Sequence, residues 1–278
     1  MAVKLIALDI DGTIIPPAHY GHDHEPTQRT REAVGALTAA GVHVVLASGR
    51  MFPGTLEVAR HLGLPGPVVC QQGCSVHLLD GTITHEFPIE REIALEIIAY
   101  AREIGRSYEW FNPLRYIASA QSPEIEQYGV VSGITPEYRP DPENAGIEPT
   151  GVGIISSATE ASEIHRELVR RHGDVLHILD FPSVTVAVAQ DANKGHALSL
   201  LCADLGIARE EVVAVGDSVN DASMLAWAGL GVGMPHSDAY AIDSADLILA
   251  AGEDVLERFI EGLVSGSILP LTVRAAAK

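Results

Sequence analysis

Short apolar runs alternate with amphipathic segments over the first part of the chain. The runs predict strands buried on both faces, because only such strands are apolar throughout; they lie at residues 3–8, 42–47 and 67–71. Apolar residues at helical spacing predict helices over 27–40 and 57–62, and Gly41 ends the first of them. The pair Asp80-Gly81, between two short runs, predicts a β-hairpin.

The pattern changes after Phe87 and returns at Lys194. The middle segment predicts a mixed sheet with helices: a helix at 90–104, two short strands flanking 112–113, and then strand, helix, strand and strand at 151–157, 159–171, 175–179 and 183–189. Residues 135–150, rich in Pro, Glu and Gly, predict an irregular stretch. The last part predicts helices at 195–205, 222–228 and 253–263, and strands at 211–215, 230–234 and 246–249.

This alternation predicts an α/β protein. Strands separated by helices form a parallel, doubly wound sheet, in which loops at the carboxyl ends of the strands form the site. The middle segment has the pattern of a separate, inserted α+β unit. We therefore expect a core domain made of residues 1–82 and 189–278, and an inserted domain made of residues 83–188.

The composition narrows the range of partners. The chain of 278 residues has 18 basic and 37 acidic residues, a formal charge of −19. This excess argues against nucleic-acid binding, which needs clustered Lys and Arg, and against docking on an anionic membrane. Three cysteines are too few for a disulfide framework, so we expect buried free thiols. With neither a signal-peptide pattern nor an apolar run of about 20 residues, we expect a cytoplasmic protein.

Two aspartates follow the first predicted strand, in Asp9-Ile10-Asp11-Gly12-Thr13. Residues two apart in an extended segment face the same way, so both carboxylates leave the sheet on one side. Carboxylates held about 4 Å apart repel by several kcal/mol at an effective dielectric of about 20, and the pair needs a cation or a shared proton. A plain Asp-Gly turn is the alternative interpretation.

A second acidic loop, Gly216-Asp217-Ser218-Val219-Asn220-Asp221, follows the strand predicted at 211–215. Mg²⁺ prefers such oxygen ligands: one or two carboxylates, a carbonyl, waters and a substrate phosphate. The alternative is an ordinary helix start, with Ser218 or Asn220 capping the helix at 222–228. Both interpretations are compatible, because helix starts favour anions.

Two further polar groups lie at the ends of predicted elements. In Ser48-Gly49-Arg50, a hydroxyl and backbone N–H groups suit a phosphoryl oxygen, although a plain turn also explains the segment. Lys194 begins a helix against the helix dipole, which suggests an anionic partner; a solvated lysine is the alternative. Four polar clusters in this order, each at the end of a candidate strand or the start of a helix, together indicate one site.

These four motifs resemble those of the haloacid dehalogenase-like (HAD) superfamily of phosphatases, in the Cof-type subgroup. That subgroup has a large cap domain between the second and third motifs, and the interval from Arg50 to Lys194 accommodates it. The resemblance implies a Rossmann-like core with an inserted cap at 83–188. It also implies Mg²⁺-dependent hydrolysis of small phosphate monoesters, such as sugar phosphates, through an aspartyl-phosphate, with a small phosphorylated metabolite as partner.

The resemblance further implies a role for each motif residue. Asp9 is the nucleophile and a metal ligand, and Asp11 is the general acid for the leaving alcohol and then the general base. Asp217 and the carbonyl of Asp11 complete the protein's Mg²⁺ ligands. The other implied roles are phosphate binding by Ser48, Gly49, Lys194 and Asn220, and support from Thr13, Arg50 and Asp221.

Other residues are candidates for substrate contacts. The family often has Asn-Gly where this chain has Gln72-Gly73, and Met-x-Asn-Ala where it has Met234-Pro235-His236-Ser237, so contacts from these loops stay open. The candidates are Gln72 and, in the cap, Trp110, Arg115 and Tyr116, although core packing and a solvated Arg also explain the cap residues. The segment with His19, His22 and His24 favours an exposed loop over a metal site, since its spacing fits no periodic element.

Two other functions stay open at this point. A phosphomutase would pass the phosphoryl group to a sugar hydroxyl instead of water. Which of the two reactions occurs would depend on how well the cap excludes water from the site. A phospholigand-binding protein without turnover is the other alternative. The presence of both Asp9 and Asp11 counts against it.

Overall fold

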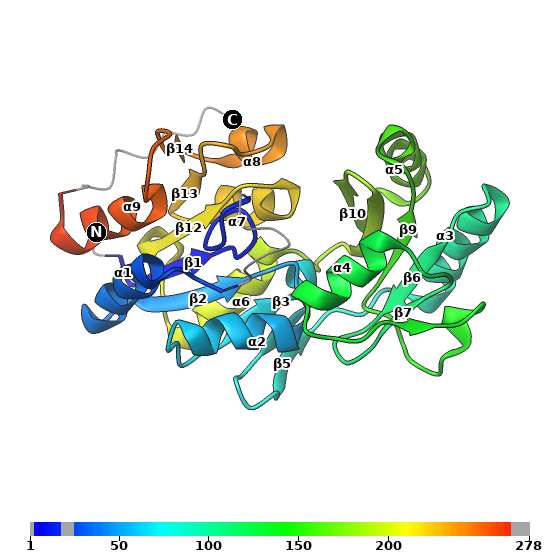
Figure 1. Cartoon of the computed structure of the whole chain (residues 1–278), viewed down its shortest axis with the longest axis horizontal. Coiled ribbons are helices and arrows are strands. Elements are labelled where there is room, and N and C mark those ends of the chain that lie inside the picture. Colours follow the sequence, from blue (N-terminus) through cyan, green and yellow to red (C-terminus); the bar gives the residue numbers. More distant parts are fainter. Residues whose placement is uncertain (1–2, 18–24, 268–278) are drawn as a thin grey trace.

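The computed structural model describes residues 3–17 and 25–267, whose strands form two sheets (Figure 1). The larger sheet contains β14 (Leu247–Ile248), β13 (Leu230–Gly233), β12 (Val212–Gly216), β1 (Leu5–Leu8), β2 (His43–Ala47), β3 (Val68–Cys70), β4 (Ser75–His77) and β5 (Ile83–Glu86), in that spatial order. Neighbours from β14 to β3 are parallel, and β4 and β5 continue the sheet as antiparallel strands. The fold class expected for the core is therefore confirmed.

Helices cover both faces of the larger sheet. They are α1 (Gln28–Ala39), α2 (Phe52–His61), α6 (Lys194–Leu205), α7 (Ala222–Trp227), α8 (Ala239–Ser244) and α9 (Val255–Ser265). In β1, Ile6 and Leu8 pack with residues of α1, α2 and α9, whereas Leu5 and Ala7 pack with residues of α6 and α7. Because β1 is buried on both sides, it is apolar at every position, as the sequence pattern predicts.

The smaller sheet lies beside the first and is built from the segment between β5 and α6 (Figure 1). Its strands are β10 (Leu176–Phe181), β11 (Val184–Ala189), β9 (Gly151–Ile155), β6 (Tyr108–Phe111), β7 (Tyr116–Ala118) and β8 (Glu137–Tyr138), in that order. Helices α3 (Arg91–Glu103) and α5 (Ala158–His172) contribute to one of its two apolar clusters. The other cluster joins the opposite face of the sheet to residues of the core, among them Met51 and Cys74.

The two sheets bear on the proposed domain division. The pairing of β4 with β5 keeps residues up to Glu86 in the larger sheet. The division into 1–82 plus 189–278 and 83–188 remains a proposal, and this pairing favours a first boundary a few residues later.

Two helices have no counterpart in the sequence prediction, and one is longer than expected. Helix α4 (Pro123–Val131) begins at Ser122, whose side chain accepts a hydrogen bond from the N–H of Ile125 at 3.4 Å, and it has Pro in its first turn. Helix α8 begins at Asp238, which caps the N–H of Ala241 at 2.9 Å. Helix α2 starts at Phe52 rather than at residue 57, because Pro is compatible with the first helical turn.

Some predictions fall on residues that the structure leaves undescribed. His19, His22 and His24 lie outside the described residues, as does most of the carboxyl-terminal tail. None of the helices in residues 3–17 and 25–267 combines the length and apolar character that crossing a bilayer requires.

Candidate active site

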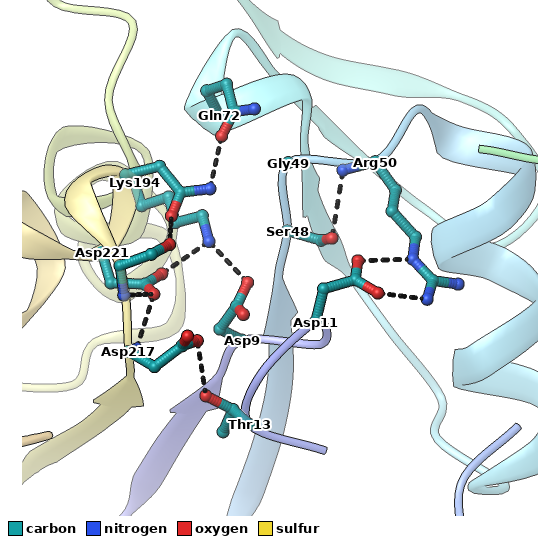
Figure 2. A network of polar contacts seen from close by, with 12 residues as sticks. Asp9, Asp11, Thr13, Ser48, Gly49, Arg50, Gln72, Lys194, Asp217 and Asp221 are labelled. Carbon is teal, nitrogen blue, oxygen red and sulfur yellow. Dashed lines mark hydrogen bonds and ion pairs between the residues drawn. The ribbon is translucent and has the colours of Figure 1, made fainter. Parts of the chain in front are cut away.

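The polar motifs meet at one edge of the larger sheet (Figure 2). Strand β1 lies between β12 and β2, so the loops that follow these three parallel strands are neighbours. This is the point at which the strand order reverses, where open α/β sheets bind ligands. Asp9, Ser48 and Asp217 follow the three strands, and the start of α6 brings Lys194 to the same place.

Lys194 joins two of the acidic residues. Its ammonium group is fully buried and lies 2.6 Å from Oδ1 of Asp9 and 2.6 Å from Oδ1 of Asp221. Burial alone would lower the pKa of Lys194, but the charges of Asp221 and Asp9 outweigh it and raise that pKa. The alternative of a solvated lysine is therefore wrong for this structure.

Asp221 holds the second acidic loop in place. Its Oδ2 accepts hydrogen bonds from the backbone N–H groups of Asp217 and Ser218, at 2.8 and 3.0 Å. With Oδ1 bonded to Lys194, both carboxylate oxygens already have partners. Asp221 thus orders the loop that presents Asp217, which agrees with the supporting role expected for it.

Gly12 makes room for Asp217. Its φ is +98°, in the left-handed region that favours glycine, and a Cβ built there would lie 2.3 Å from both carboxylate oxygens of Asp217. The hydroxyl of Thr13 lies 3.5 Å from Oδ1 of Asp217. The glycine of the first motif is therefore needed for the turn and for the close approach of the two acidic loops.

Asp9, Asp217 and Asp221 form an oxygen cluster that fits a divalent cation. One carboxylate oxygen from each lies within 4.8 Å of the others. The pKa of Asp9 is raised, mainly by its burial and next by the negative charge of Asp221. The pKa of Asp217 is raised in the same way, by its burial and by the charge of Asp9. Lys194 supplies only one positive charge, so a hard cation such as Mg²⁺ would relieve the remaining repulsion. Asp9 and Asp217 are the better ligands, because Asp221 is already engaged.

Asp11 points away from this cluster toward Arg50 (Figure 2). Nε of Arg50 donates to Oδ2 of Asp11 at 2.7 Å, and its terminal NH₂ donates to Oδ1 at 2.6 Å. The guanidinium is buried, whereas the Asp11 side chain is 34% exposed. The backbone N–H of Arg50 also donates to Oγ of Ser48 at 3.1 Å. Arg50 therefore orients both Asp11 and Ser48.

Gln72 closes the site on the side of the smaller sheet. Nδ2 of Asn220 donates to its Oε1 at 2.5 Å, and a Cβ on Gly49 would meet the Gln72 amide at 2.6 Å. Gln71 and Gln72 both have positive φ, +50° and +63°, which is costly for residues with a side chain and is typical of functional sites.

Gln71 is not among the candidate residues that the sequence offers, and His236 lies in a loop whose contacts the sequence leaves open. The amide of Gln71 donates to the carbonyl of Asn112 at 2.9 Å and so ties the two sheets together. Nε2 of His236 lies 3.6 Å from Oδ2 of Asp217. Both follow strands of the larger sheet, and that position was the available signal.

Comparison with known proteins shows to which family this chain belongs. A family model described as haloacid dehalogenase-like hydrolase matches residues 6–255. The chain belongs to this family. Phosphatase YwpJ of Bacillus subtilis is 24% identical over 283 residues, covering 91% of this chain and 96% of that protein. An HMP-PP phosphatase of Shigella flexneri is 24% identical over 230 residues and covers 82% of each. These comparisons confirm the predicted superfamily and enzyme class, a phosphatase of the HAD type.

Solved structures of proteins in this family have the same fold as this chain. A haloacid dehalogenase-like hydrolase from Bacteroides thetaiotaomicron has a TM-score of 0.78 at 25% identity, covering 93% of this chain and 98% of that one. A HAD subclass IIB sugar phosphatase has a TM-score of 0.79 at 20% identity, covering 96% and 100%. The second sheet, inserted between the second and third motifs, is the cap expected of a Cof-type HAD protein.

The cap residues named from the sequence separate into two groups. Tyr116 and Gln72 line a cavity of about 260 Å³ between cap and core. Trp110 is fully buried on the other face of the cap sheet, in the cluster that includes α3 and α5, and its indole donates to the carbonyl of Ile147 at 3.3 Å. Arg115 pairs with Glu137 at 2.6 and 2.7 Å. The structure brings Tyr116 and Gln72 to the site, and it does not bring Trp110 or Arg115 there.

Proposed function

We propose that this HAD-type enzyme is a Mg²⁺-dependent phosphatase that hydrolyses small phosphate monoesters through an aspartyl-phosphate on Asp9. The observation that carries the proposal is the arrangement of Asp9, buried and bonded to Lys194, beside the carboxylate of Asp217. Named phosphatases among the relatives support it. The three buried free cysteines agree with a cytoplasmic location.

In the proposed first step, a carboxylate oxygen of Asp9 attacks the phosphorus and the bond to the leaving oxygen breaks. Lys194, Asn220, the hydroxyl of Ser48 and the N–H of Gly49 would bind phosphoryl oxygens. Asp9, Asp217 and the carbonyl of Asp11 would hold Mg²⁺, which supplies neutralisation of the charge that develops on those oxygens.

Asp11 would move the protons. It gives one to the leaving alkoxide, and its ion pair with Arg50 has to open for this transfer. In the second step it takes a proton from water, whose oxygen attacks the phosphorus and releases phosphate and the Asp9 carboxylate. Arg50 would return Asp11 to its starting orientation between the two steps.

The experiment that tests the proposal measures free phosphate from a panel of phosphate monoesters. We expect release with Mg²⁺, none with a chelator, and none from Asp9→Asn, which removes the nucleophile and the charge of one proposed metal ligand. Asp204→Asn, an exposed site on α6, is the matched control and should keep full activity. An isomeric phosphate ester without free phosphate would indicate a phosphomutase. No reaction with the whole panel would indicate a binding protein.

A further inference from the structure

The cavity between cap and core has an unusual lining for a site that receives phosphate esters. Seven of its eleven lining residues are aromatic or aliphatic, and two are glutamates, Glu109 and Glu124. Within the described part of the chain, no Lys, Arg or His lines it. The lining therefore disfavours a second anionic group on the ligand and favours an apolar body.

The cavity adjoins the phosphate end of the site through two of its lining residues. Gln72, which bonds Asn220, also lines the cavity. Tyr128, another lining residue, donates its hydroxyl to the carbonyl of Gly49 at 3.0 Å. A phosphate ester bound at Asp9 would thus direct its leaving group into this space.

Glu109 is built into the wall of the cavity. Along β6, Tyr108 and Trp110 face the cluster that includes α3 and α5, so the alternation of a strand turns Glu109 and Phe111 toward the core. Opposite Glu109 on β9 lies Gly153, where a Cβ would be 2.3 Å from Oε1 of Glu109. The missing side chain at Gly153 therefore provides the space that the carboxylate occupies.

No cationic side chain in residues 3–17 and 25–267 forms an ion pair with this carboxylate. The side chain is 6% exposed, and among the described residues its one hydrogen-bond partner is the hydroxyl of Tyr116, 2.5 Å from Oε2. Burial raises the pKa of Glu109 to about 7, against the opposing hydrogen bond from Tyr116. A buried carboxylate is costly unless it is paired, so a positively charged ligand group in the cavity would be favoured beside Glu109.

We infer that this cavity receives the leaving group of the substrate, and that Glu109 selects an alcohol that carries a protonated amine on a small apolar or aromatic body. The inference rests on the proposed phosphatase function for its place in the reaction. The cavity volume limits the size of the leaving group: an apolar cavity of about 150 Å³ holds benzene, and this cavity has about 260 Å³. One substituted ring fits, and phosphorylated acids or bisphosphates are disfavoured.

The test compares three benzyl phosphates with one body and different charge: 4-(aminomethyl)benzyl, 4-methylbenzyl and 4-carboxybenzyl phosphate. With Mg²⁺, we expect kcat/KM to fall in that order. In Glu109→Gln, which keeps the shape and removes the charge, kcat/KM for the amine should fall about 10- to 100-fold while the methyl compound changes little. Glu96→Gln on α3, 69% exposed and outside the cavity, should leave all three values unchanged.

The outcomes separate this inference from the proposed function. Hydrolysis of all three esters without a preference for the amine, or a preference that Glu109→Gln leaves intact, would overturn the inference and leave the phosphatase standing. If no phosphate ester of any kind is hydrolysed, the proposed function fails and the inference fails with it. A preference for the amine that Glu109→Gln abolishes would support both.

Discussion

Replacing Glu109 by Gln should change how the stability of the protein depends on pH. Burial raises the pKa of this carboxyl from 4.5 to about 7. Between these values the folded chain keeps the proton that the unfolded chain loses, so wild-type stability falls as pH rises through the window and stays lower above it. At about 1.4 kcal/mol per pKa unit, the effect is about 3 kcal/mol.

The glutamine cannot ionise, so this loss should be absent from the variant. We expect Glu109→Gln to gain about 3 kcal/mol in unfolding free energy relative to wild type between pH 4.5 and pH 7.5, measured by urea denaturation in a chelator. Titration of Asp9 and Asp217 is common to both proteins and cancels in the difference. Glu57→Gln, an exposed site on α2, should show no such trend. A difference that is flat across the window would refute the claim that Glu109 is an uncompensated buried carboxyl.

Three further variants test the site. Lys194→Met removes the cation between two buried carboxylates and should cost about 3–5 kcal/mol of unfolding free energy, and a loss below about 1 kcal/mol in urea denaturation would contradict that arrangement. Gly12→Ala should displace Asp217 and raise the Mg²⁺ concentration needed for activity at least tenfold. The control is Gly41→Ala: Gly41 also has a positive φ, +82°, but a Cβ there would meet no described atom within 4 Å, so this variant should lose stability alone. Equal Mg²⁺ requirements for the two variants would contradict the close approach of Gly12 and Asp217. Asp11→Asn should slow alkyl phosphates severely and 4-nitrophenyl phosphate least, because only poor leaving groups need a proton, so an equal loss for both would count against an acid role.

The strands of the core can be predicted from the sequence because each one is recognisable from its own residues. A strand covered by helices on both sides is apolar throughout, so β1, β2 and β12 can be located without their neighbours. The carboxyl ends of adjacent parallel strands share one edge, so motifs that follow such strands had to converge. Asp9, Ser48 and Asp217 lie together for this reason, and the start of α6 adds Lys194 at 2.6 Å from Asp9.

The cap could not be predicted in the same way. Strand β6 reads Tyr-Glu-Trp-Phe, and both of its faces are buried, one against the cluster with α3 and α5 and one toward the core. The four residues of β6 do not themselves indicate whether Tyr108 and Trp110 or Glu109 and Phe111 face the site. The sequence therefore offers Trp110 as a candidate contact, whereas in the structure it is Glu109 that lines the cavity. The ion pair of Asp11 with Arg50 depends on side-chain directions that the motif spacing leaves open.

The most direct test of the account is a crystal structure of the protein with Mg²⁺ and beryllofluoride, which mimics a phosphoryl group on a carboxylate. We expect the fluoride adduct on Asp9, one Mg²⁺ bound by Asp9 and Asp217, and contacts from Lys194 to the adduct. An adduct on another residue, or an ion bound away from Asp217, would contradict the central claim that these two acidic loops form one phosphoryl-transfer site.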